Sequence, residues 1–393
     1  MRLARLAACS VLLCATGVAQ RSPLPPEQLA KVRGVLDAVY RLDYAKAETR
    51  SREMISQWPE DPAGYVYLAR VFWQKLLFEQ RALSLERFSQ PDFFSETPRY
   101  KTAAAPAAAQ RFHTASEEAM RRARAHAAKR PKDSAALYLA GAAYQNEASF
   151  QISMNNAWLA AVRAGHQSHQ AHRELLALDS GYGDAHFVTG IYNYTVGSLP
   201  WKVRWIAVLL GYQGSKERGR EELELAAAKG DIVTDDACTI LTLLYAREKR
   251  YDLAIGKLDE LCKRYPENYL TRLDLAGLLV RHGKPAAAVE VYRQVLATPG
   301  FFEKTIVYNN LAITYRIMKD YAQAEKWLRL SLSGSSLPGR ARAAALLELG
   351  KTLDLAGRRA EAVQQYRLVQ QAADFDNSRR EAGQYLNHPY REK

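Results

Sequence analysis

Residues 241–258 read LTLLYAREKRYDLAIGKL, and the same 18-residue pattern returns three more times along the chain. The four copies begin at residues 241, 275, 311 and 349, so they are spaced by 34, 36 and 38 residues. Each copy has leucine first, a small residue second and alanine at the fourteenth position. Self-similarity at a nearly fixed period is the sequence signature of a repeat architecture. The second half of the chain is therefore predicted to be an array of stacked units.

Each copy predicts two antiparallel helices. Apolar residues recur at positions i, i+3 and i+4, which places them in one stripe along each helix. The small second residue lets the partner helix approach closely, and the alanine lies at the tightest crossing. Turn residues separate the two stripes, as in Lys249-Arg250, His282-Gly283-Lys284-Pro285 and Ala356-Gly357-Arg358. One helix pair cannot bury both of its faces, so we expect the pairs to stack into a right-handed superhelix with a concave groove.

These segments resemble the tetratricopeptide repeat (TPR), whose period is about 34 residues. The resemblance implies an all-α solenoid that binds a partner instead of catalysing a reaction. Four regular units are predicted over residues 233–373, followed by a C-terminal tail over 374–393.

The region 20–232 uses the same unit less regularly. A first helix begins near Leu137, and its apolar pattern continues through Trp158 to Arg163, which predicts an unusually long helix. Residues 89–109 contain three prolines and an alanine tract, a composition that predicts a loop. The N-terminal half is therefore expected to be irregular, with extended helices.

Residues 184–230 predict a repeat with a short extra helix, Trp201–Leu210, between its two helices. The segment is similar to bacterial exported TPR proteins of unassigned function, and it also resembles a eukaryotic TPR family of inclusion and lipid-droplet clearance. The extra helix carries aromatic and basic residues that suit a membrane interface. We favour the alternative, a buried cap on the neighbouring repeat.

Residues 1–19 predict a secretory signal peptide, with Arg2 and Arg5 before the apolar run Leu6–Val18. The run is too short to span a bilayer, and small residues follow it as a cleavage site. Leu6-Ala7-Ala8-Cys9 also resembles a lipoprotein motif, which is the less favoured alternative. We expect an exported protein, either periplasmic or secreted.

The formal net charge is +13, of which the signal peptide contributes two. A basic exported protein suits acidic protein faces, acidic polymers or anionic lipid. Nucleic acid is not an expected partner, because the basic residues are spread along helices without an aromatic-interleaved strand motif.

The sequence contains no nucleophile elbow, phosphate-binding glycine loop or Cys-x-x-Cys motif, so we predict no enzyme, no cofactor and no catalytic residue. His166, His169 and His172 follow one another at every third position, and we interpret them as solvated helix residues instead of metal ligands. Asp235 and Asp236 are interpreted as acids in the first turn of a helix capped by Thr234, where they favour the helix dipole.

Cys238 and Cys262 are expected at adjacent ends of one helical hairpin. A disulfide is geometrically allowed there and would stabilise by roughly 3 kcal/mol. Two buried free thiols are the favoured alternative.

Helical spacing predicts which side chains of the first helices face the groove, and Asp354 is a further candidate. The predicted partner-binding residues are Thr239, Leu243, Arg247, Leu273, Arg281, Asn309, Arg316 and Lys351. The arginines favour an acidic or carboxylate-bearing partner segment. The alternative is a ligand- or lipid-handling protein that accompanies a transport system, with a pocket lined by the aromatic-rich region 182–212.

Overall fold

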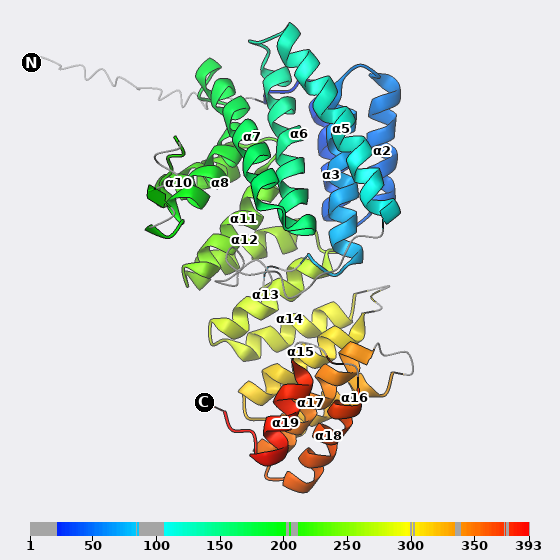
Figure 1. Ribbon diagram of the computed structural model, residues 1–393. Helices are drawn as coiled ribbons and strands as arrows, with labels where there is room; N and C mark the ends of the chain where they lie inside the picture. The colour runs from blue at the N-terminus through cyan, green and yellow to red at the C-terminus, as the bar shows by residue number, and fades with distance from the viewer. Residues whose placement is uncertain are drawn as a thin grey trace, which may run out of the picture.

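The computed structural model is an array of helices that descends from the N-terminal half to the C-terminal repeats (Figure 1). It describes residues 22–83, 85, 106–201, 204–205, 211–298, 301, 303–334, 339–372, 374 and 377–392. Over these residues the chain forms α-helices and no strand, and neighbouring helices pack in chain order. The predicted all-α helical-repeat fold is therefore confirmed.

Within the described residues, eight α-helices build the first half, and they are spaced less regularly than those of the second half. They are α1 (Pro26–Tyr40), α2 (Tyr44–Gln57), α3 (Pro62–Glu79), α5 (Pro106–Lys129), α6 (Ser134–Phe150), α7 (Trp158–Leu178), α8 (Ala185–Gly197) and α10 (Lys216–Lys229). Nine more described α-helices follow: α11 (Thr234–Arg247), α12 (Tyr251–Arg264), α13 (Tyr269–Arg281), α14 (Pro285–Leu296), α15 (Lys304–Ile317), α16 (Tyr321–Leu332), α17 (Gly339–Leu355), α18 (Arg359–Gln371) and α19 (Ser378–Asn387).

The turn inside each helix pair uses one residue in the left-handed conformation. Lys249, Gly283, Lys319 and Gly357 have φ between 59° and 76°. In each turn two successive N–H groups donate back to carbonyls of the preceding helix, which closes the helix end. Leu42, between α1 and α2, has the same conformation and the same hydrogen bonds. The first helix pair therefore has the same turn as the four regular units.

The predicted long helix from Leu137 to Arg163 is wrong. The chain reverses after α6 through a π-helical turn, Gln151–Asn155, and through Asn156 at φ 51°. Helices α6 and α7 then run side by side, because Gly141 leaves room for the His172 ring. A Cβ atom added at Gly141 would lie 2.2 Å from His172 Cε1.

Two predicted irregular segments are partly helical. Of the loop predicted over 89–109, residues 89–105 lie outside the described part of the chain, and α5 begins at Pro106, since proline suits the first helical turn. The predicted tail 374–393 contains α19, which packs on α18 and α17. Its residue Ala382 is fully buried, and Tyr385 lies 5.6 Å from Tyr366 between ring centroids.

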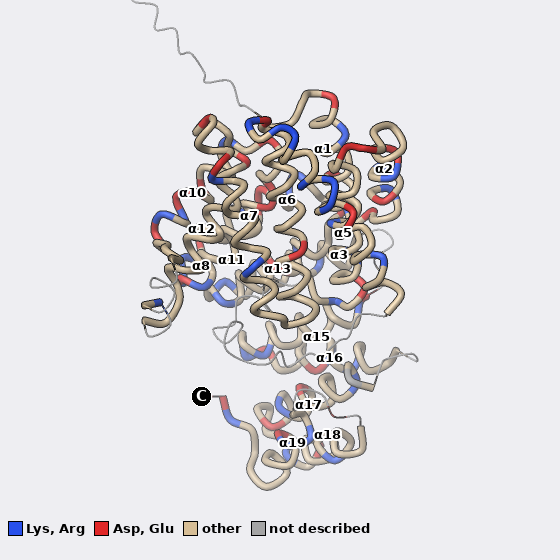
Figure 2. The backbone as a smooth tube through the Cα atoms, turned by 45° about the horizontal axis from the view of Figure 1, so that its top comes forward, with Lys and Arg blue, Asp and Glu red and all other residues tan. Residues whose placement is uncertain are grey.

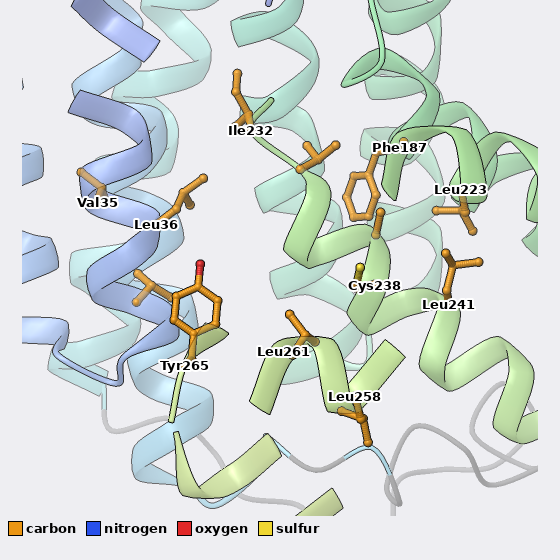
Figure 3. Packing of buried hydrophobic residues seen from close by; sticks show 14 of the residues in the cluster. Val35, Leu36, Phe187, Leu223, Ile232, Cys238, Leu241, Leu258, Leu261 and Tyr265 are labelled. Carbon is orange, nitrogen blue, oxygen red and sulfur yellow. The ribbon is translucent and has the colours of Figure 1, made fainter. Parts of the chain in front are cut away.

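Helix α1 lies beside the start of the regular repeats, although about 190 to 230 residues separate them (Figure 3). The rings of Tyr40 and Tyr265 stack with centroids 5.1 Å apart. Asn268 Nδ2 donates to the Tyr40 carbonyl oxygen at 2.7 Å, and Arg41 pairs with Glu267 at 2.9 Å. One core of buried residues runs through both halves, from Leu24 to Ala324. The two halves are therefore one packed body.

A buried ion pair lies at the centre of this junction. Arg70 of α3 and Asp236 of α11 are 2.6 Å apart, and their side chains are 12% and 13% exposed. The Tyr40 hydroxyl also donates to Asp236 at 2.6 Å. Burial and the neighbouring Asp236 raise the pKa of Tyr40 well above its ordinary value, so the phenol stays protonated and donates. Asp236, which the sequence suggested as a helix-dipole acid, thus joins three helices.

Within the described ranges, no helix combines the length and the apolar character that a membrane crossing requires.

Candidate partner-binding groove

The first helices of the regular units, α11, α13, α15 and α17, carry every predicted groove residue. At the N-terminal end this face is covered. Thr239 lies within hydrogen-bonding reach of the Tyr40 phenol, and Leu273 packs against the shared core. Thr239 and Leu273 therefore contact other parts of the same chain and do not face an open groove. The sequence pattern did not predict this, because it does not show that α1 lies beside α11.

The middle of the predicted face holds Leu243, Arg247 and Arg281. Leu243 and Arg247 are half-buried, and the charge of Arg247 acts on the Tyr194 phenol of α8. Arg281 is exposed, with Nη2 3.5 Å from the Ala246 carbonyl oxygen and the guanidinium 5.5 Å from the Tyr251 ring centroid. Arg247 and Arg281 therefore do not form one cationic site, because Arg247 lies near Tyr194 and Arg281 near Tyr251.

At the C-terminal end two predicted residues share one carboxylate. Arg316 Nη2 lies 3.3 Å from Glu348, and Lys351 Nζ lies 2.9 Å from the same residue. Lys351 also pairs with Glu381 of α19 at 3.1 Å. The two cationic side chains are only 11% and 13% exposed. Burial lowers the pKa of Lys351, but Glu348 and Glu381 raise it further, so the ammonium group stays charged.

The last described residues, 388–392, return to this cationic end (Figure 2). Glu392 Oε1 lies 2.6 Å from Arg316 Nη1, and the Tyr390 hydroxyl lies 3.2 Å from the same nitrogen. The Tyr390 ring has Arg316 and Lys351 at 5.5 Å and 5.6 Å from its centroid. A cation positioned over an aromatic ring is attracted to the negative face of that ring. The chain end therefore contacts both groove cations.

Asp354 holds the backbone of this segment. Its side chain is fully buried and accepts the Tyr390 backbone N–H at 2.8 Å and the Tyr366 hydroxyl at 2.9 Å. Arg359 pairs with Asp354 at 3.1 Å and donates to the carbonyls of Tyr385 and Leu386 at the end of α19. Arg359 and Asp354 thus contact both the end of α19 and the Tyr390 backbone.

Asn309 lies two helical turns before Arg316 on α15. Its Oδ1 atom is buried and lacks a hydrogen-bond partner among the described residues, as does Arg316 Nε. Buried polar atoms ordinarily have a partner, so these two atoms are exceptions within the described residues. Both atoms lie on the helix that contacts the chain end.

The three histidines separate in the structure. His172 is buried against α6, His169 stacks on Tyr192 with centroids 3.7 Å apart, and His166 meets Tyr212. Burial lowers the pKa of both His169 and His172 to about 4, so both rings are neutral at pH 7. Two of the three are therefore core residues, and the prediction of a solvated row is wrong for them. No group suited to a metal ion occurs among the described residues.

The first turn of α11 is not capped by Thr234, contrary to our expectation. Thr234 donates its hydroxyl to the Gly230 carbonyl. Asp184 accepts the backbone N–H groups of Asp231, Ile232 and Val233 at 2.7 to 3.1 Å. Burial raises the pKa of Asp184 to about 6, even though these hydrogen bonds lower it. Asp184, about 50 positions away, thus holds the backbone of the three residues that precede α11.

Cys238 and Cys262 are free thiols. Burial raises the pKa of Cys238 to about 11 and also raises that of Cys262. Thiolates are the reactive form of cysteine, so burial disfavours the reactive form of both residues.

A cleft of about 380 Å³ lies between α1 and the start of α11. Its charged walls are already paired, Arg33 with Asp231 and Arg264 with Asp235. None of the residues that line it belongs to the region 182–212.

The inserted helix is described only at Trp201, Arg204 and Trp205. Trp201 and Trp205 are 68% and 55% exposed, which differs from the buried cap that we favoured. The other residues of Trp201–Leu210 lie outside the described part of the chain.

Comparisons with known proteins agree with this architecture. Residues 304–373, which span α15 to α18, match the family model of the tetratricopeptide repeat. Helices α15 to α18 are therefore tetratricopeptide repeats. This repeat generally mediates contacts between proteins. None of the curated proteins matches the sequence.

Solved structures of similar proteins include PilF of Pseudomonas aeruginosa, at 17% identity and a TM-score of 0.36, which covers 62% of this chain and 98% of its own. Yeast Tom70 has 12% identity and a TM-score of 0.38, with 92% and 88% covered. A tetratricopeptide repeat protein from Parabacteroides merdae has 12% identity and a TM-score of 0.33, with 82% and 99% covered. Scores this low carry no argument about function.

Sequence reasoning missed the residues that complete the cationic end. Arg316 and Lys351 were predicted, but Glu348, Tyr390 and Glu392 were not. The pattern Ala382, Tyr385 and Leu386 has helical spacing and was the available signal for α19.

Proposed function

We propose that this protein is a non-enzymatic, exported scaffold that binds a protein segment in the groove of its last regular repeats. One observation carries the proposal: Arg316 and Lys351 lie together on the first helices α15 and α17 and hold carboxylates. Repeat arrays bind partners along such concave faces. The covered N-terminal end of the face restricts the proposed site to α15 and α17.

An acidic partner fits this site. Arginine binds carboxylates through paired, charge-assisted hydrogen bonds, which are about twice as strong as neutral ones. The partner segment is therefore expected to present carboxylates to Arg316 and Lys351.

The proposal is tested by crosslinking in cells that express the tagged chain, followed by capture and mass spectrometry. The variant Arg316→Glu/Lys351→Glu should lose the captured protein, because both site charges are reversed. A matched charge reversal on the second helices α12 and α16, Lys263→Glu/Lys326→Glu, should still capture the protein partner. Equal capture by both variants would contradict a partner site at Arg316 and Lys351. A lipid or small molecule in the eluate without a protein would support ligand handling instead.

Export is a separate part of the proposal, supported by the charge and length pattern of residues 1–19. Mass spectrometry of the purified protein should find a chain that begins at Gln20. A full-length chain in the cytoplasmic fraction would contradict export.

A further inference from the structure

The geometry points to the identity of the groove ligand: an extended segment with an aromatic residue two positions before an acidic one, whose place the chain's own Tyr390 and Glu392 hold until a partner displaces them. This inference rests on the proposed function, because it names the partner chemistry of the same site. It requires that the chain end is bound as a peptide would be, and that it can leave.

The chain end is bound in the manner of a peptide. His388 at its start is extended, with φ −131° and ψ 131°, because a residue before proline avoids the helical region. Asp354 accepts the Tyr390 backbone N–H, a contact that any non-proline residue can make. The sequence-specific contacts come from two side chains, Tyr390 between the cations and Glu392 on Arg316.

The spacing of these two side chains, two residues apart, is the spacing that an extended segment requires. Residues i and i+2 of an extended segment point to the same side. Tyr390 and Glu392 therefore both reach Arg316, while Arg391 is exposed. A partner with the same two residue types at the same spacing would make the same contacts.

The site itself is independent of the chain end. Helices α15, α17 and α18 supply Arg316, Lys351, Asp354 and Arg359, and their packing involves a core of Leu349, Leu353 and Tyr366. None of the residues 388–392 belongs to the apolar core that α17, α18 and α19 share. The segment after α19 can therefore leave without unfolding the repeats.

Displacement has a measurable consequence. A docked chain end reduces the fraction of molecules with an open site, and the apparent dissociation constant rises by the inverse of that fraction. A short tether gives an effective concentration in the mM range, so even weak internal docking competes with an added peptide.

The experiment uses a fluorescein-labelled synthetic peptide of residues 387–393, NHPYREK, and the full chain. The release variant Tyr390→Ala/Glu392→Ala should bind the peptide at least tenfold more tightly than the unaltered chain, measured by fluorescence anisotropy. A chain truncated after Asn387, which retains α19, should behave like the release variant. Circular dichroism checks that both remain helical.

Three controls address specificity. Adding Arg316→Gln to the release variant should abolish binding, whereas Arg329→Gln, at an exposed arginine of α16, should leave it unchanged. A peptide with alanine in place of its tyrosine and glutamate should not bind. A peptide with tyrosine and glutamate adjacent should bind more weakly than the original.

Equal peptide affinity for the unaltered chain, the release variant and the truncated chain would overturn the inference, as would undiminished binding of the alanine peptide. Either result leaves the proposed function standing if protein capture still depends on Arg316 and Lys351. Loss of that dependence, with peptide binding intact, would instead show a site that serves only the chain's own end.

Discussion

The two halves of this chain use the same helix pairs and reach different surfaces. Helix α1 of the first half lies beside the start of the regular repeats. Its residue Tyr40 stacks on Tyr265 and contacts Thr239 of α11. In the last regular repeats the pairs stack with similar turns, and their first helices keep a face for Arg316 and Lys351. The N-terminal end of the predicted face is thus covered by a whole helix, whereas its C-terminal end is contacted by α19 and the short segment after it.

The largest expected effect comes from breaking the junction of the two halves. Asp236→Ala leaves Arg70 buried without its carboxylate and removes the acceptor of the Tyr40 hydroxyl. Removing one member of a buried pair destabilises by about 3 to 5 kcal/mol. We expect a large fall in the thermal midpoint, measured by circular dichroism.

The matched change in the regular half is Asp259→Ala. Asp259 and Lys263 form an ion pair on α12, with side chains 47% and 77% exposed. Such a pair contributes about 1 kcal/mol or less. Similar losses for both variants would show that the junction is not a buried contact.

The second effect is a pH dependence that belongs to the first half. Burial lowers the pKa of His172 to about 4, below its ordinary value of 6.5. A histidine with a depressed pKa contributes stability that is full above 6.5 and is lost as the pH falls toward 4. The loss is roughly 3 kcal/mol, because one pKa unit corresponds to about 1.4 kcal/mol.

Denaturant unfolding from pH 7 to pH 4 tests this effect in the unaltered chain and in His172→Gln. The variant is less stable at pH 7, and the difference between the two proteins should shrink as the pH falls. A difference that is constant across this range would contradict the burial of a neutral ring.

The smallest effect compares two glycines. A Cβ atom at Gly219 would lie 2.3 Å from Tyr194 N and 2.6 Å from the Gly190 carbonyl oxygen, so α8 and α10 could not keep their approach. Gly219→Ala should destabilise by about 1 to 3 kcal/mol. Gly256 is exposed on α12 with nothing within 4 Å, and Gly256→Ala should stabilise by up to about 1 kcal/mol. Thermal midpoints that move in the same direction would contradict this contrast.

Local patterns predicted the regular half because its contacts are local. The spacing of Leu241 and Ala254 and their equivalents already encodes each helix pair and its neighbour. The contacts of Asp184 with the start of α11, and of Tyr40 with Asp236, join residues about 50 and 196 positions apart. The repeat period of the sequence does not predict contacts between residues so far apart in the chain.

The candidate site was predicted only in part for the same reason. Helical spacing placed Arg316 and Lys351 on one face, but it also placed Thr239 there, which the first half covers. The chain end was missed because α19 is a single helix outside the repeat pattern. Glu392, which follows α19, contacts Arg316 from 76 positions away in the sequence.

The most direct test of the groove is site-specific photocrosslinking in cells. A benzophenone amino acid replaces Asn309 in the groove or Lys326 on the exposed face of α16, in chains that also carry Tyr390→Ala and Glu392→Ala. We expect a discrete protein adduct from position 309 and none from position 326. Equal adducts from both positions, or none from position 309, would contradict a partner site on the first helices of the last repeats.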